Sequence, residues 1–153
     1  MKVVVLGANG MLGRDIVQSA HDRGWFVVEC SRHQVDITQP DHIQSLSFLK
    51  PVDAIINCAA YTQVDACEDH QDDANRVNST GPSQLAKWCH AHQIPLIHFS
   101  TDYVFDGLKS ADLKYDESDS CQPINAYGLS KWKGEEWIRS HCPNHYIFRI
   151  QWL

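Results

Sequence analysis

The sequence has no apolar run of the length that a membrane span needs. A bilayer is crossed by about 20 consecutive apolar residues, whereas the run that opens the chain covers only residues 3–6. That opening is also too short for a signal peptide, and no cleavage pattern follows it. We therefore expect no membrane association, no export and a cytoplasmic location.

Basic residues are also scarce. The chain has 13 Lys and Arg against 19 Asp and Glu, which gives a formal net charge of −6. Proteins that bind nucleic acid or an anionic membrane surface need clustered Lys and Arg to neutralise phosphates, and the sequence shows no such cluster. We therefore exclude nucleic acid as a partner.

Metal-binding and redox patterns are missing as well. The six cysteines include no Cys-x-x-Cys pair, so neither a zinc ribbon nor a dithiol redox motif is present. The nine histidines lack the spacing of metal ligands, and His90 and His92 fall on different faces of a helix. We expect no metal, and we favour reduced cysteines over the disulfides that an even count also allows.

What the sequence does have is a regular alternation of strand and helix patterns. Apolar runs predict strands at residues 2–7, 25–30, 53–59, 94–100 and 145–150. Helical periodicity predicts helices at residues 11–22, 39–50, about 71–92 and 126–141. This alternation predicts one domain over residues 1–153, of the α/β class, with a doubly wound parallel sheet covered by helices on both faces.

No helix follows the last predicted strand before the sequence stops at residue 153. A sheet that ends there leaves apolar strand surface uncovered, unless a partner or further sequence covers it. We therefore expect a domain truncated after its fifth or sixth strand, and an uncovered sheet would favour a homo-oligomer.

Three glycines lie three residues apart between the first strand and the first helix. Gly7, Gly10 and Gly13 form a G-x-x-G-x-x-G pattern, which differs from the commonest dinucleotide fingerprint. Glycine lets the backbone approach a pyrophosphate, and a helix N-terminus offers free N–H groups. The pattern therefore predicts a nucleotide site, with a simple glycine turn as the alternative.

The end of the second strand bears on the choice of nucleotide. An acidic residue there binds the ribose 2′-OH of NAD, whereas an Arg accommodates the 2′-phosphate of NADP. The strand ends in Ser31-Arg32, which favours NADPH and leaves NADH as the alternative; Arg32 could equally be a solvated surface residue. Asp36 and Ile37 could border the adenine, although Asp36 could also cap a turn.

Tyr127 and Lys131 lie four residues apart, so both side chains emerge on the same helix face. A free tyrosine has a pKa near 10, and a neighbouring ammonium group would lower that pKa by favouring the phenolate. A lowering of about 3 units corresponds to roughly 4 kcal/mol. The pair predicts proton transfer to a carbonyl; the alternative is a surface tyrosine that packs along a lysine stem.

A loop rich in Asp, Ser, Gly and Pro covers residues 101–125 and follows the fourth strand. Ser100 and Thr101 stand at its start, at the sheet edge where ligands of this fold bind. A hydroxyl there can hydrogen-bond a substrate carbonyl and align it with the tyrosine. The alternative is that Ser100, Thr101 and Asp102 only cap a turn.

Taken together, these segments resemble the extended short-chain dehydrogenase/reductases, and within them the dTDP-4-dehydrorhamnose reductase family. The resemblance runs from Met1 to about Arg149 and rests on "GANGMLGRD", "VDIT", "NCAAYTQVDACE", "STDYVFDG", "PINAYGLSK" and "HYIFR". It implies a Rossmann-like, NAD(P)-binding fold and reduction of the nucleotide sugar dTDP-4-dehydro-6-deoxy-L-mannose. Family members are nearly twice as long, so the resemblance also implies that the C-terminal substrate domain is missing.

The resemblance further implies a role for each matching position. Thr101, Tyr127 and Lys131 would be catalytic, with Tyr127 as the proton donor. Asp102, Tyr103 and Asn125 would lie near the substrate. The implied cofactor-binding residues are Gly7, Asn9, Gly10, Met11, Leu12, Ser31, Arg32, Asp36, Ile37, Cys58, Ala59, Ala60, Tyr61, Tyr127 and Lys131.

The same resemblance leaves a second function open. It extends to the non-catalytic regulatory subunit of methionine adenosyltransferase, so a retained fold need not mean retained turnover. The alternative to a reductase is therefore a dinucleotide-binding regulatory or interaction module, or an inactive fragment.

Overall fold

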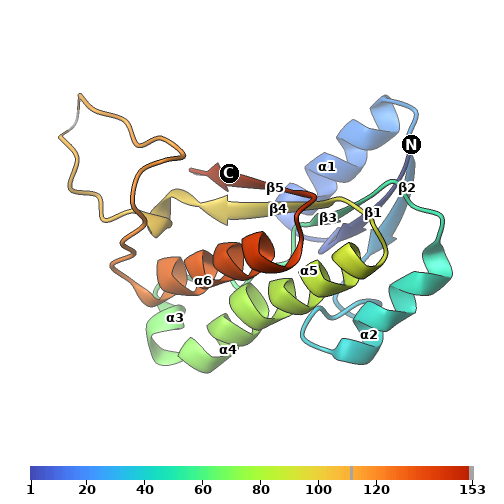
Figure 1. The fold of residues 1–153 in the computed structure, drawn as a ribbon, viewed down its shortest axis with the longest axis horizontal. Coiled ribbons are helices and arrows are strands. Elements are labelled where there is room, and N and C mark those ends of the chain that lie inside the picture. Colours follow the sequence, from blue (N-terminus) through green and yellow to red (C-terminus); the bar gives the residue numbers. More distant parts are fainter. Residues whose placement is uncertain (111, 152–153) are drawn as a thin grey trace.

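The computed structural model describes residues 1–110 and 112–151, and its centre is a five-stranded parallel sheet (Figure 1). The last two residues of the expected 1–153 domain lie outside the described part. The strand order is β2-β1-β3-β4-β5, and every neighbouring pair is parallel. The strands are β1 (Lys2–Leu6), β2 (Phe26–Cys30), β3 (Ala54–Asn57), β4 (Leu96–Thr101) and β5 (His145–Ile150).

Helices cover both faces of the sheet, as the doubly wound prediction requires. The chain moves from β1 to β2 in one direction and from β2 to β3, β4 and β5 in the other. Because crossovers between parallel strands are right-handed, α1 (Met11–Asp22) lies on one face and the later helices lie on the opposite face (Figure 1). Those later helices are α2 (Pro40–Ser45), α3 (Ala66–Asp69), α4 (Gln71–Asn75), α5 (Gly81–Ala91) and α6 (Ala126–His141).

The core divides into two apolar layers because side chains alternate along each strand. Val3 and Val5 of β1 face α1, where they meet Val17. Val4 and Leu6 face the other layer, whose members from β3, β4, α2, α5 and α6 include Ile43, Ile55, Leu85, Leu96 and Ile138. The continuous apolar runs of β1 and β3 are thus strands buried on both faces.

The sheet face beside α1 is uncovered over its last two strands. Tyr146 and Phe148 of β5 are 58% and 50% exposed, and their register partners on β4 are Ile97 and Phe99. Phe99 and Phe148 stack with their ring centroids 5.8 Å apart. The expected uncovered strand surface is therefore an apolar patch next to α1.

The predicted helix over 71–92 is interrupted in the structure. A π-helical turn (η2, Arg76–Thr80) separates α4 from α5. Pro82 has no N–H to donate to the carbonyl of Asn78, four residues earlier, so regular α-helical bonding fails there. A Cβ added to Gly134 would lie 2.2 Å from the Asn78 carbonyl oxygen, so the absence of a side chain at Gly134 lets α6 pack directly on this turn.

The other predicted helices and strands agree with the structure to within a few residues, except that the helix predicted at 39–50 continues as a 3-10 helix (η1, Leu46–Leu49) after α2. A further short 3-10 turn, η3 (Asp102–Val104), follows β4. Among the helices of the described residues, none is both long enough and apolar enough to cross a membrane.

Candidate active site

The glycine loop joins β1 to α1 and is held close to the neighbouring strands. Gly7 has a φ of +73°, which glycine adopts without strain, and its N–H donates to the carbonyl of Cys30 at 2.9 Å. A Cβ on Gly7 would lie 2.8 Å from the backbone nitrogen of Ala59, and one on Gly13 would lie 2.3 Å from the carbonyl of Gly7. A side chain is therefore excluded at Gly7 and at Gly13.

This loop stands at the switch point of the sheet, where the order of strands reverses. β1 and β3 are neighbours, yet the chain leaves them for opposite faces of the sheet. Ligands of open parallel sheets bind at this point, beyond the carboxyl ends of the strands. A glycine-rich turn at the start of α1 fits a pyrophosphate, because free backbone N–H groups can approach it.

Two adjoining cavities open at this edge, and together they collect the predicted cofactor residues. The first has a volume of about 250 Å³ and is lined by Gly7, Asn9, Gly10, Ser31, Arg32, Asp36, Ile37, Cys58, Ala59, Ala60 and Tyr61, with Val35 and Val77. The second, of about 390 Å³, is lined by Met11, Leu12, Thr101, Asp102, Tyr103, Tyr127 and Lys131, among others. Gly10, Cys58 and Ala60 border both cavities.

The first cavity is also lined by the groups expected to bind the ribose and the adenine. Arg32 Nε lies 3.1 Å from Asp36 Oδ2, and the Arg32 side chain is 75% exposed. Burial tends to raise the pKa of Asp36, but hydrogen bonds from Thr38 and Arg32 hold it below its usual value. Asp36 Oδ1 accepts from both the N–H and the hydroxyl of Thr38, so Asp36 also caps a turn.

Thr101, Tyr127 and Lys131 meet in the second cavity, although they come from β4 and α6. Tyr127 packs edge-on against Tyr103, with ring centroids 5.8 Å apart. The Thr101 hydroxyl accepts from the N–H of Tyr103 and donates to Asp102. Thr101 thus caps the turn after β4, as the simpler interpretation held, and lines the cavity as well.

The pKa of Tyr127 differs from the sequence-based expectation. Burial raises it above its ordinary value, and the interaction with the Thr101 side chain lowers it by less. The expected lowering by a lysine ammonium group is therefore wrong for these residues by themselves, because desolvation of the phenolate dominates.

Lys131 is a buried residue, which excludes the interpretation that it is a surface stem. Its side chain is 2% exposed, and Nζ donates to the carbonyl of Phe99 at 2.6 Å. Burial lowers its pKa to about 8, while Glu135 and Cys58 act in the opposite direction. A lysine in this range can exchange protons near neutral pH.

Behind Lys131, a buried ion pair ties α6 to the end of the sheet. Glu135 is fully buried and accepts from Arg149 Nε at 3.0 and 3.2 Å and from Nη2 at 2.7 Å. Arg139 Nη2 lies 2.9 Å from the same carboxylate. The guanidinium of Arg149 also lies over the ring of Phe105. This arrangement fixes β5 and the loop that begins at Phe105, after β4, relative to α6, the helix that carries Tyr127.

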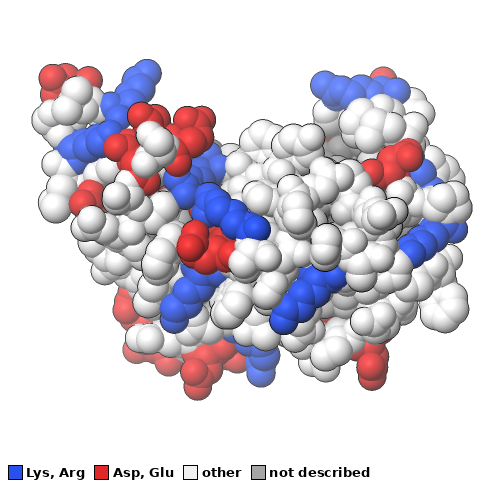
Figure 2. Space-filling model, in the orientation of Figure 1, with Lys and Arg blue, Asp and Glu red and all other residues white. Residues whose placement is uncertain are grey.

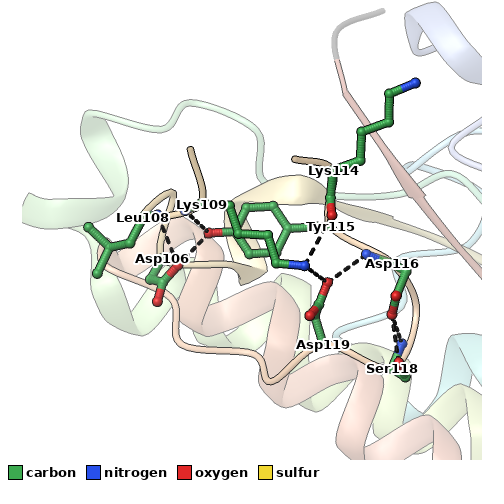
Figure 3. Close-up of polar contacts among 8 residues, drawn as sticks. All are labelled: Asp106, Leu108, Lys109, Lys114, Tyr115, Asp116, Ser118 and Asp119. Atoms are coloured by element: carbon green, nitrogen blue, oxygen red, sulfur yellow. Dashed lines mark hydrogen bonds and ion pairs between the residues drawn. The ribbon is translucent and has the colours of Figure 1, made fainter. Parts of the chain in front are cut away.

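The loop after Phe105 is folded on itself (Figure 3). Lys109 Nζ bonds Asp119 at 2.5 Å, and the hydroxyl of Tyr115 donates to Asp106 at 2.5 Å. The ring of Tyr115 stacks on Phe105, with centroids 4.3 Å apart. Basic and acidic side chains therefore lie side by side on this part of the surface (Figure 2). The loop forms one wall of a third cavity that also includes Asp102 and Tyr103.

One predicted site residue lies elsewhere. Asn125 is the N-cap of α6, and its side chain accepts from the N–H of Gly128 at 2.7 Å. It is absent from the lining of the described cavities. Its predicted role near the substrate stays a prediction, whereas its structural effect is to fix the helix that carries Tyr127.

Three buried polar residues near the site were not among the predicted ones. Asn57, Asn78 and His98 are each at most 1% exposed. Asn78 bonds the backbone of Tyr61 and the hydroxyl of Ser130. For Asn57 and His98 the available signal was a polar residue inside an apolar run, as in "AIINC" and "LIHFS"; Asn78, in "RVNST", carries no such signal. Among the described residues, no cluster of His, Cys, Asp and Glu could hold a metal ion.

Comparison with known proteins places this arrangement in a family. The family model described as RmlD substrate binding domain matches residues 1–153. The chain is 42% identical to a probable low-salt glycan biosynthesis reductase of Haloferax volcanii, covering all of this chain and 54% of the relative. It is 41% identical to the dTDP-4-dehydrorhamnose reductase of Mycolicibacterium smegmatis, covering 99% of this chain and 46% of that protein. The chain thus spans about half the length of these relatives.

Solved structures of dTDP-4-dehydrorhamnose reductases have the same fold as this chain. A dTDP-4-dehydrorhamnose reductase from Clostridium acetobutylicum superposes with a TM-score of 0.94 at 36% identity, over 99% of this chain and 54% of that one. A dTDP-4-dehydrorhamnose reductase from Bacillus anthracis, solved in complex with NADP, superposes with a TM-score of 0.91 at 32% identity, over 97% and 52%.

Proposed function

Since the chain belongs to the family of the RmlD substrate binding domain model, we propose that it carries the cofactor-binding and catalytic residues of a nucleotide-sugar reductase. The proposed reaction reduces dTDP-4-dehydro-6-deoxy-L-mannose to dTDP-L-rhamnose. The observation that carries the proposal is that Thr101, Tyr127 and Lys131 line one cavity, which borders the glycine loop.

We propose NADPH as the cofactor, with NADH as the alternative. The exposed guanidinium of Arg32 at the end of β2 is suited to a 2′-phosphate. The pyrophosphate would lie over Gly7, Gly10 and the first turn of α1, where the glycines leave the backbone free of side chains. The NADP complex of the Bacillus anthracis relative supports this choice. When bound, a reduced nicotinamide supplies the hydride that the carbonyl carbon accepts.

The residues of this chain would supply the proton and the alignment. Tyr127, whose raised pKa keeps the phenol protonated at neutral pH, would donate its proton to the carbonyl oxygen as the carbon is reduced. The Thr101 hydroxyl would hydrogen-bond the same oxygen and hold it near Tyr127. Lys131 would face the ribose and the phenol from within the protein.

The test is NADPH oxidation by the 153-residue chain with dTDP-4-dehydro-6-deoxy-L-mannose, with cofactor binding followed in parallel. Turnover that is lost in Tyr127→Phe and kept in Tyr146→Phe, an exposed tyrosine of β5, would support the reductase. Turnover that survives Tyr127→Phe would refute the role of Tyr127.

A second candidate function is a cofactor-binding regulatory module. It is favoured by one observation, namely that the predicted cofactor-binding residues already line a cavity of their own at the glycine loop. Such a module would bind NADPH equally well with Tyr127 or Phe at this position, and would show no turnover with either. Loss of both binding and turnover in the parent chain would contradict both functions.

A further inference from the structure

The first turn of α6 is held by two segments from other parts of the chain. α6 begins at Ala126, and Tyr127 is its second residue. A Cβ added to Gly128 would lie 2.2 Å from the carbonyl oxygen of Tyr103, so the absence of a side chain there lets the turn η3 pack directly on the helix. From α3, which lies beside the start of α6 (Figure 1), Glu68 Oε1 accepts a hydrogen bond from the N–H of Ala126 at 2.8 Å.

This bond satisfies a backbone group that the local cap of α6 does not reach. The first N–H groups of an α-helix have no partner within the helix, and an N-cap side chain accepts from the second or third helical residue. Asn125 accepts from Gly128, the third residue, at 2.7 Å. The N–H of Ala126, the first residue, donates to Glu68, which lies 58 positions earlier in the chain. The cap of α6 is therefore shared between a local residue and one from another element.

Glu68 belongs to the segment that leads from β3 into α3 and lines the proposed site. This segment contributes four residues to the cavity that holds Thr101, Tyr127 and Lys131, namely Cys58, Ala60, Thr62 and Val64. Cys67, next to Glu68, is fully buried. Burial raises the pKa of Tyr127, and the neighbouring thiol of Cys67 acts in the same direction. The bond from Ala126 to Glu68 thus joins the wall of the cavity to the helix of Tyr127.

The place of the Tyr127 phenol depends on the first turn of α6, because Tyr127 directly follows Ala126. A misplacement of about 1 Å can slow a reaction about 100-fold. We infer that Glu68 is a positioning residue, whose carboxylate holds the first turn of α6 against the segment that lines the cavity and thereby sets the position of Tyr127. The catalytic part of this inference rests on the proposed function, whereas the hydrogen bond itself does not.

The contact can be removed without disturbing the core. Glu68 is exposed, so its replacement leaves no buried void. The bond from Gly128 to Asn125 and the packing of Gly128 on η3 remain in place, so α6 should still form. We therefore expect a variant that lacks the bond to keep its fold and its affinity for NADPH, whose proposed pyrophosphate site lies at the glycine loop, and to lose rate.

Three variants of Glu68 separate the hydrogen bond from the charge. Glu68→Ala removes both. Glu68→Asp keeps the charge but is one methylene shorter and cannot reach Ala126, whereas Glu68→Gln keeps the reach and an acceptor oxygen without the charge. In NADPH oxidation we expect kcat to fall about tenfold in Glu68→Ala and Glu68→Asp, with KM for NADPH nearly unchanged. In Glu68→Gln most of the parent kcat should be restored.

Asp69→Ala is the matched control. It removes an exposed carboxylate from the next position of α3 and should leave kcat unchanged.

Amide hydrogen exchange at Ala126, followed by NMR, tests the bond without any need for turnover. In the parent chain, in Glu68→Gln and in Asp69→Ala this amide should be protected. In Glu68→Ala and Glu68→Asp it should exchange about fivefold faster, which is the effect expected for the loss of one helix cap.

An unprotected Ala126 amide in the parent chain would overturn the inference, and so would a kcat that is unchanged in Glu68→Ala. An equal loss of rate in Glu68→Gln and Glu68→Ala would also overturn it, because the hydrogen bond would then not be the cause. If Glu68→Ala does not fold, Glu68→Asp answers the same question. The expected exchange rates in a chain without turnover would support the contact of Glu68 with α6 and contradict the proposed function alone.

Discussion

Replacing Arg149 by Met should destabilise the protein strongly, because it leaves the buried carboxylate of Glu135 without its main hydrogen-bond partner. The change removes three contacts to Glu135, at 3.0, 3.2 and 2.7 Å, and keeps most of the aliphatic stem. Breaking a buried pair from one side costs about 3–5 kcal/mol. Because Arg139 still reaches the carboxylate at 2.9 Å, we expect about 3 kcal/mol, at the lower end of that range.

Arg139→Met is the matched control. Its side chain is 40% exposed, so solvent screens its interaction, and its loss leaves the paired contacts of Arg149 intact. We expect a cost of about 1 kcal/mol or less. Urea unfolding of the two variants measures the free energies directly. Equal losses in both variants would refute the assignment of Arg149 as the principal partner.

The effect of Arg149→Met should also depend on pH. Burial opposes ionisation of Glu135, but the bonds from Arg149 hold its folded-state pKa below the ordinary 4.5. A carboxylate with a lowered folded pKa stabilises the fold above its unfolded pKa, and this contribution is lost as the pH falls through the folded value. The difference between parent and variant should therefore be largest near neutral pH and shrink below about pH 4.5. A difference that stays constant with pH would contradict this account.

Three further perturbations test other parts of the structure. Gly134→Ala should lower the free energy of unfolding, measured in urea, by about 2 kcal/mol or more, because the new Cβ would lie 2.2 Å from the Asn78 carbonyl oxygen. In the control variant Gly24→Ala the new Cβ has no atom within 4 Å, so the loss should be smaller. Arg32→Ala should weaken NADPH binding and leave NADH binding nearly unchanged in fluorescence titrations, and equal weakening would contradict its role at the 2′-phosphate. Asp119→Asn should increase proteolytic cleavage within residues 106–121 by weakening the contact with Lys109, whereas unchanged cleavage would contradict that contact's role.

The order of elements could be predicted because it follows from local patterns. The buried strands are continuous apolar runs, and each helix is marked by its own periodicity or by a cap such as Asn125. The interruption at η2 was not predicted, although Pro82 was visible in the sequence. Its form depends on the approach of α6 at Gly134, and that is a contact between segments far apart in the chain.

The candidate site, too, could be predicted from the sequence only in part. Residues at strand ends, such as Gly7 and Thr101, could be placed at one sheet edge from topology alone. The protonation states could not be predicted, since they depend on burial and on partners from other elements. Tyr127 illustrates this, because its pKa follows desolvation and not the lysine four residues away. In the sequence, His98 is a single polar residue in a strand, because the side chains that it contacts, Asn57 and Lys131, come from β3 and α6.

The strand order also constrains how the chain can fold. β1 pairs with β2 and with β3, so its second partner lies about fifty residues along the chain. Closing that loop costs entropy before any pairing repays it. During synthesis, β1 would be made first yet remain an open edge until β3 has emerged. We therefore expect slow folding, in which the two strands that flank the nucleotide cradle join late and the cradle forms only once they have joined.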